Sequence, residues 1–206
     1  NRNAGSHAVE YVGLANVLGT NYAVDNKQYG KGTIKRRRID PSGFQVRKAD
    51  GRVANASKVY DGTDLSDLPT GASLVTPTAT SGNTGIVVHD GGKITFKLKD
   101  GTSGYYSSDR DGDHRTSHVS EAHYVAYDIV AQTSDDTNNP LTNYTFGSAA
   151  AEAAGTLKNL ENITNATPAH VTASGTITPA DLTMTTHNIT KVYDAMAEHT
   201  DGNRSI

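Results

Sequence analysis

Apolar and polar residues alternate along several short stretches of the chain, as they do in β-strands that bury one face. Such stretches are residues 44–47, 93–99 and 182–185. Residues 86–88 and 93–99 flank His89-Asp90-Gly91-Gly92, and glycines at this place predict a β-hairpin. Residues 124–130 are rich in aromatic and β-branched side chains, which predicts a further strand. The pattern as a whole predicts an all-β fold.

One segment departs from this pattern. Ser148 can cap an alanine-rich run over residues 149–154, and Leu157 and Leu160, three positions apart, suit one face of a helix. Gly155 opposes the helix, because glycine costs about 1 kcal/mol relative to alanine there. The conformation of residues 148–163 therefore decides between two architectures. One is a β-sandwich of the immunoglobulin-like kind, and the other is a β-grasp-like sheet that holds one helix.

Short segments recur in the same order along the chain, which indicates a repeat. The pairs are Ser57-Lys58-Val59-Tyr60-Asp61 with Thr190-Lys191-Val192-Tyr193-Asp194, Thr20-Asn21-Tyr22 with Thr142-Asn143-Tyr144, and Gly32-Thr33-Ile34 with Gly175-Thr176-Ile177. Proline lies at two equivalent positions, Pro41 and Pro179, and ends the strand before it because it cannot donate a hydrogen bond to the ladder. We take these positions as junctions between modules. We therefore expect the closing part of a preceding module (1–37), a complete β module (38–178) and the opening part of the next (179–206).

The first recurring segment predicts a structural turn. Its residues are Lys58, Tyr60, Asp61 and Gly62 in one copy and Lys191, Tyr193 and Asp194 in the other. We expect Tyr60 to be a core residue that anchors the end of a strand. We expect Asp61 to bond the turn backbone, and Gly62 to supply a positive φ.

The composition narrows the function classes. The chain has 206 residues, 35% of them hydrophobic, and no cysteine, which excludes disulfides, cysteine-bound metals and a thiol nucleophile. A net charge of −3 argues against nucleic acid binding. No apolar stretch reaches the roughly 18 residues of a membrane-spanning helix. The sequence contains no nucleophile elbow, phosphate-binding glycine loop or metalloprotease motif. We therefore expect a non-enzymatic protein without nucleic acid binding or membrane insertion.

Two groups of side chains are candidate metal ligands. Asp109, Asp111 and Asp113 place carboxylates at alternate positions, a spacing that suits Ca²⁺, although the rest of the calcium-loop pattern is missing. The alternative is a solvated acidic loop. His114, His118 and His123 form a histidine cluster, but no helical pattern brings them together, so exposed histidines are favoured over zinc.

Two other groups suggest ligand binding. The long middle segment, residues 104–130, carries residues that suit a glycan- or receptor-binding face, namely Tyr105, Tyr106, His114, His118 and Tyr124. The basic run over residues 35–38 suits sulfated glycans or acidic headgroups. In a strand, however, neighbouring side chains point to opposite faces, so a solvated strand that resists edge pairing is the alternative.

Several segments, taken in order, resemble the YDG-type repeat module of filamentous-haemagglutinin-like bacterial surface adhesins, exoproteins of two-partner secretion. These are Ile177-Thr178-Pro179-Ala180, Lys58-Val59-Tyr60-Asp61-Gly62-Thr63, Asn143-Tyr144 and Gly175-Thr176-Ile177. The resemblance covers most of the chain. It departs at Asp194-Ala195-Met196, which replaces Asp-Gly-Thr, and at the enlarged segment 104–130.

The resemblance implies a secreted segment at the bacterial surface, associated with the outer membrane, that acts as a stalk or presents an adhesive face in virulence. Its implied partners are the neighbouring modules of the same chain and a host or bacterial surface glycan or protein. Some adhesins of this kind carry sugars on Asn-X-Ser/Thr sequons. The corresponding candidates here are Asn55, Asn143, Asn162, Asn165, Asn188 and Asn203.

Overall fold

The computed structural model describes residues 3–11, 28–78, 84–101, 103–186, 192, 193 and 195. Within them, β-strands dominate and one α-helix is present, which confirms the predicted all-β class. The strands form a six-stranded sheet, a three-stranded sheet and two two-stranded sheets.

The six-stranded sheet is built around one long strand. Its members are β5 (Ala56–Val59), β6 (Leu65–Ser66), β8 (Ile94–Leu98), β9 (Gly104–Ser107), β10 (Tyr124–Thr133) and β13 (Ala169–Thr178). β10 pairs antiparallel with β13, with β9 and, at its other end, with β8. β13 in turn pairs in parallel with β5. The sheet is therefore mixed, and β13 joins its parallel part to its antiparallel part.

Two small sheets and four short 3-10 helices complete the body. The strands are β3 (Arg37–Ile39), β11 (Tyr144–Phe146) and β12 (Lys158–Asn159) in one sheet, and β4 (Gln45–Arg47) and β7 (Ser73–Val75) in the other. The 3-10 helices are η1 (Pro41–Gly43), η2 (Val88–Asp90), η3 (Pro140–Asn143) and η4 (Leu160–Asn162).

The sheets of the body enclose a common core. Phe44, which precedes β4, makes edge-on ring contacts with Phe96 of β8 at 4.9 Å and with Phe146 of β11 at 5.7 Å. Val125 and Val171 face the same core from β10 and β13. Alternation explains this arrangement: every second residue at the start of β13 points inward.

Two predicted strands have a different structure. Residues 88–90 form η2 instead of the first arm of a hairpin, and β8 pairs with β10. The cause is Tyr144, whose hydroxyl donates to Asp90 Oδ2 at 2.7 Å and accepts from the Val87 N–H at 3.2 Å. Residues 182–185 do alternate, but they lie outside every sheet of the described chain and are exposed.

The predicted helix is present but short. α2 (Ala149–Ala154) begins after Ser148, whose Oγ accepts from the Ala151 N–H, and ends at Gly155, whose φ is 71°. Leu160 nevertheless reaches the core, from η4. Because α2 buries none of its residues, no sheet holds it as the β-grasp alternative requires.

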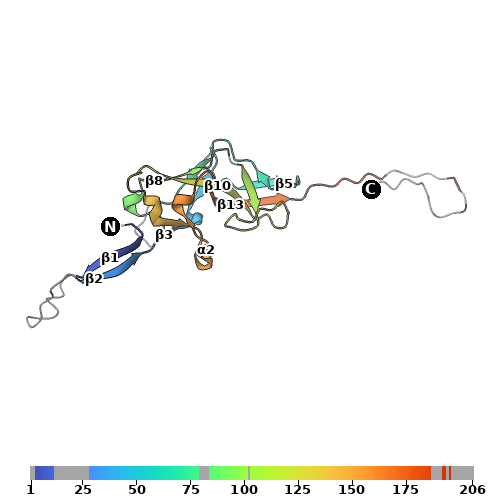
Figure 1. The fold of residues 1–206 in the computed structure, drawn as a ribbon. Helices are drawn as coiled ribbons and strands as arrows, with labels where there is room; N and C mark the ends of the chain where they lie inside the picture. The colour runs from blue at the N-terminus through green and yellow to red at the C-terminus, as the bar shows by residue number, and fades with distance from the viewer. Residues whose placement is uncertain are drawn as a thin grey trace, which may run out of the picture.

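The N-terminal hairpin and the C-terminal extension lie at opposite ends of the body. β1 (Gly5–Tyr11) and β2 (Gln28–Ile34) form an antiparallel two-stranded sheet that projects from one end, while the C-terminal extension, residues 179–186, leaves from the other (Figure 1). The predicted module boundary after residue 37 lies inside β3, which pairs in parallel with β11 of the body.

The hairpin repeats the pairing of β10 with β13. Gly32 lies opposite His7 in the hairpin, and in the body the Gly175 N–H donates to the His123 carbonyl at 3.1 Å. This common register aligns residues 7–11 with residues 123–127, and both read His-X-Val-X-Tyr. The match escapes a sequence search for repeats because the intervening loops differ in length. The other landmarks, Thr20-Asn21-Tyr22, Lys191 and Asp194, lie outside the described residues.

Candidate functional site

The signature turn after β5 is held by one lysine. Lys58 Nζ donates to Asp61 Oδ1 and to the Thr63 carbonyl, both at 2.7 Å. Asp61 Oδ1 also accepts from the Thr63 N–H at 2.9 Å, and Gly62 has a φ of 82°. The hydrogen bonds from Lys58 and from Thr63 lower the pKa of Asp61 to about 2. The predicted roles of Asp61 and Gly62 in this turn are confirmed.

Tyr60, by contrast, is not a core residue, because 46% of it is exposed. Its backbone, not its ring, attaches the turn to the body: the Tyr60 N–H donates to the Thr178 carbonyl at 2.8 Å. Lys58 takes the inward position instead, with Nζ 5.5 Å from the ring centre of Tyr106. The second copy of this residue, Tyr193, is 90% exposed.

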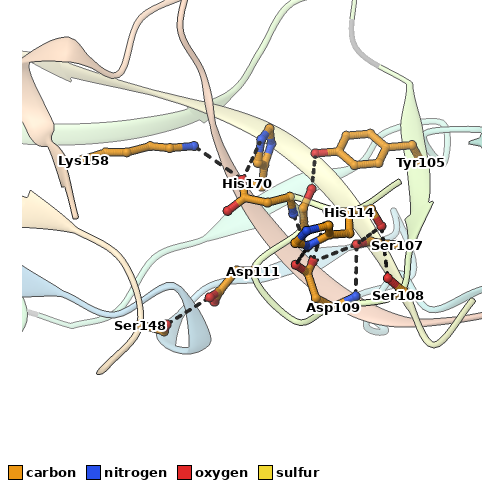
Figure 2. Close-up of polar contacts among 11 residues, drawn as sticks. Tyr105, Ser107, Ser108, Asp109, Asp111, His114, Ser148, Lys158 and His170 are labelled. Atoms are coloured by element: carbon orange, nitrogen blue, oxygen red, sulfur yellow. Dashed lines mark hydrogen bonds and ion pairs between the residues drawn. The ribbon is translucent and has the colours of Figure 1, made fainter. Parts of the chain in front are cut away.

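The acidic loop uses its three carboxylates separately (Figure 2). Asp109 Oδ1 accepts from the Ser107 hydroxyl at 2.9 Å, and Asp111 Oδ2 accepts from the Ser148 hydroxyl at 3.1 Å. Asp113 Oδ1 lies 3.8 Å from Lys158 Nζ and 3.9 Å from His170 Nε2. The predicted calcium ligands are thus directed to different partners. Across the described chain, no three His, Asp or Glu side chains are grouped to hold a metal ion, and this includes the three clustered histidines.

One ion pair closes this loop. His114 Nδ1 lies 2.5 Å from Asp109 Oδ2, and the Asp113 N–H donates to Asp109 Oδ1 at 3.0 Å. The hydrogen bond to Asp109, and its charge, raise the pKa of His114. Burial raises the pKa of Asp109, but the bonds from His114 and Ser107 outweigh it and leave that pKa lowered. The charged forms of both side chains therefore stabilise the folded loop.

The predicted ligand-binding face on segment 104–130 is not assembled. Tyr105 and Tyr106 are buried, so neither ring is available to stack against a sugar. The Tyr105 hydroxyl donates to the Gly112 carbonyl at 2.9 Å, and the Arg115 guanidinium covers its ring at 4.3 Å. The remaining members of the predicted face are more accessible: His114 and His118 are exposed and Tyr124 is partly buried.

Sequence reasoning missed His170, which lies beneath this loop. His170 Nδ1 is 2.8 Å from Asp128 Oδ1 of the neighbouring strand, and its ring meets the ring of Tyr105 edge-on. The pairing of β10 with β13 sets His170 directly opposite Asp128. No local signal marks this contact, because the two residues are 42 positions apart.

The basic run is largely engaged by the protein itself. Arg36 bonds Glu161 at 2.7 Å, Arg37 Nε donates to the Gly85 carbonyl at 2.6 Å, and Arg38 Nη1 donates to the Gly147 carbonyl at 3.1 Å. Lys35 is exposed. Arg37 and Arg38 of β3, and Arg36 just before it, therefore attach this strand to other segments of the body.

A groove lies between the base of the hairpin and the body. Its volume is about 790 Å³, within the range of ligand pockets. The charged residues of its lining are Lys35, Arg36, Arg37, His89, Asp90, Lys93 and Asp135. Lys93 in this lining is paired with Asp135 at 3.1 Å, whereas Lys35 is exposed and favours an anionic occupant. The Ala4 N–H donates to Asn143 Oδ1 at 2.7 Å and ties the hairpin to one wall.

The predicted sequons differ in accessibility. Asn55, Asn162 and Asn165 are exposed, whereas Asn143 is partly buried and holds Ala4. Asn188 and Asn203 lie outside the described residues.

Comparison with known proteins gives no match: no family model fits the chain, and neither a curated protein nor a solved structure resembles it significantly. None of the helices described is long and apolar enough to cross a membrane.

Proposed function

We propose that the chain is a non-enzymatic repeat segment of a secreted bacterial surface adhesin of the filamentous-haemagglutinin-like kind, and that it acts as a stalk or presents an adhesive face. The observation that supports this proposal is the repeated strand pairing. Gly32 lies opposite His7 on the neighbouring strand of the hairpin, just as Gly175 bonds His123 across the pairing of β13 with β10 in the body. In repeat proteins each unit contacts only its neighbours, an arrangement that suits an elongated stalk.

The positions of the two ends also favour a spacer. The hairpin and residues 179–186, which follow β13, leave the body at opposite ends (Figure 1). Modules joined in this way follow one another along a line, so each added copy increases the reach of the protein. Asp109 of the acidic loop is engaged by Ser107 and His114, and Asp111 by Ser148, which also suits a structural role.

Cell-surface labelling tests this proposal. Antibodies raised against the folded chain should label intact cells of the organism that produces it, without permeabilisation. An antibody to a cytoplasmic protein is the control, and it should label only permeabilised cells. Labelling that appears only after permeabilisation would contradict the surface assignment and with it the adhesin proposal.

A second candidate is the binding of an acidic glycan in the groove beside the hairpin. It rests on the groove volume and on the exposed Lys35 at its rim. The Lys35→Glu variant should lose binding to an array of sulfated and sialylated glycans. The matched variant Lys97→Glu, at an exposed position of β8 outside this lining, should retain it. The alternative face on residues 104–130 has less support, because Tyr105 and Tyr106 are buried.

A further inference from the structure

One edge of β13 is covered along only part of its length. On one side, residues 169–174 pair antiparallel with β10. On the other side, β5 pairs with β13 only from Gly175 onward. The chain before β5 turns away from this edge, because the Ala54 N–H donates to the Val46 carbonyl of β4 at 2.8 Å. β13 is therefore uncovered on this side in the stretch that precedes its pairing with β5.

The uncovered stretch presents main-chain hydrogen-bonding groups. Successive residues of a strand direct these groups to opposite edges. The Gly175 N–H faces β10, where it donates to the His123 carbonyl, and the Thr178 carbonyl faces β5, where it accepts from the Tyr60 N–H. By this alternation, the N–H and C=O of Thr172 also point to the side of β5, which does not reach them. Such an edge can pair with a further strand.

A groove lies beside this stretch of β13. Its volume is about 370 Å³, within the range of ligand pockets. Its lining includes residues 172–174 of β13, Tyr124 of β10, Arg110 of the acidic loop, and Gln45 and Asn55, which are both exposed. The main-chain groups of Thr172 therefore adjoin a space that an added chain segment can enter.

Arg110 gives the groove its charge. It is exposed, and it is the one charged residue in a lining that contains no carboxylate. Within the described residues its guanidinium forms no ion pair, and the carboxylates of Asp109 and Asp111 on either side are bonded to other side chains. The Thr172 hydroxyl donates to the Arg110 carbonyl at 2.8 Å, which holds the backbone of Arg110 beside the open edge. The groove thus favours a partner with a negative charge.

We infer that this groove binds an extended peptide with a carboxylate side chain, by β-strand addition to β13. The peptide continues the line of β5, and its backbone bonds the N–H and C=O of Thr172. Its carboxylate pairs with Arg110, and an apolar side chain beside it contacts Val53, which is 37% exposed in the lining. A strand edge suits a peptide better than a glycan, because it offers donors and acceptors at the spacing of another backbone. This inference rests on the proposed function, since it names the partner of the adhesive face.

Selection from a display library of random octapeptides, with the whole chain as bait, tests this inference. The selected peptides should share an acidic residue among β-branched or aromatic neighbours. Fluorescence anisotropy then compares variants with one selected peptide. Arg110→Glu should weaken binding at least ~10-fold, since it replaces an ion pair with two like charges. Lys97→Glu makes the same change of charge at an exposed position of β8 outside the groove, and it should bind as the wild type does.

Amide hydrogen exchange followed by NMR locates the bound peptide. In the complex the Thr172 N–H should exchange at least ~10-fold more slowly than in the free chain, because a hydrogen bond to the peptide protects it. The Gly175 N–H is the internal control: it already donates to the His123 carbonyl and should change little. The same peptide methylated on its backbone nitrogens cannot donate to β13 and should lose affinity.

Three results would overturn the inference: a library without binders, equal affinity for wild type and Arg110→Glu, or unchanged exchange of the Thr172 N–H in the complex. Protection of this N–H by a glycan but by no peptide would also overturn it, because the partner would then belong to another class. Surface labelling tests the adhesin proposal separately. Labelling of permeabilised cells alone, with peptide binding intact, would refute that proposal and leave the groove a peptide site.

Discussion

Lys58 of β5 and Asp61, which follows that strand, form an ion pair with Nζ and Oδ1 2.7 Å apart. Lys58 also stands opposite Ile177 in the parallel pairing of β5 with β13. The pair therefore links the signature turn to the strand that ends the body. This accounts for the choice of lysine and aspartate, since the lysine reaches the turn and the aspartate holds both the lysine and the backbone of Thr63.

The low pKa of Asp61 predicts a pH dependence. Because this pKa is about 2 in the folded state, below that of a free carboxyl, ionisation of Asp61 stabilises the fold above about pH 4. That stabilisation is lost as the pH falls towards 2. The melting temperature of Asp61→Asn should thus lie below that of the wild type at neutral pH, and the gap should narrow in acid. A gap that is constant from pH 7 to pH 2 would contradict this prediction.

The pair of Asp109 and His114 predicts a second titration. The raised pKa of His114 means that its contribution is fully present below about pH 6.5 and is lost as the pH rises through the raised value. The contribution of Asp109, whose pKa is lowered, is present above about pH 4 and is lost in acid. The loop should be most stable between these limits.

NMR titration of the His114 ring measures the first of these effects. The midpoint should lie above 6.5 in the wild type and should fall in Asp109→Asn. Asp67→Asn removes an exposed carboxylate elsewhere and should leave the midpoint unchanged. Equal midpoints in wild type and Asp109→Asn would show that the pair does not form in solution.

The buried hydroxyl of Tyr144 should matter for stability. Tyr144→Phe leaves Asp90 Oδ2 and the Val87 N–H without this partner, which should reduce the free energy of unfolding by about 1–3 kcal/mol. Tyr60→Phe is the matched control, since half of Tyr60 is exposed, and it should have little effect. Urea denaturation followed by tyrosine fluorescence gives both values. Similar losses in the two variants would argue against the role assigned to the Tyr144 hydroxyl.

Gly175 should tolerate no side chain. A Cβ at this position would lie 2.6 Å from the Tyr124 carbonyl carbon and from the Val125 nitrogen, which are backbone atoms of the adjacent strand. Gly175→Ala should therefore cost about 1–3 kcal/mol through overpacking. Gly92→Ala, where a Cβ meets nothing within 4 Å, should be close to neutral. Thermal unfolding by circular dichroism compares the two, and an unchanged melting temperature for Gly175→Ala would refute the prediction.

Local patterns predicted the parts of the fold that depend on neighbouring residues. The alternation at residues 44–47 and 93–99 gave two strands, and Ser148 and Gly155 marked the ends of the helix. The hairpin proposed for residues 86–99 failed because Tyr144, more than 50 positions away, bonds Asp90 and fixes η2. Such a contact leaves no trace in the local pattern.

In the candidate site, too, features that depend on neighbouring residues were predictable and features that depend on distant contacts were not. The turn at Asp61 and Gly62 was predictable because all its bonds lie within a few residues. The burial of Tyr105 was not, because it depends on Gly112 and Arg115 folding back over a strand. The carboxylates at alternate positions suggested calcium, yet two of them bind partners in distant segments, Ser148 for Asp111 and Lys158 for Asp113.

The mixed pairing of β13 has a mechanical consequence. Its last four residues, from Gly175 to Thr178, run parallel to β5, and the chain leaves the body in the direction of the strand. Tension applied from this end slides β13 lengthwise along β5, so the four paired positions bear the load together. The C-terminal end of the body should therefore resist a lengthwise pull better than the small size of the sheet suggests.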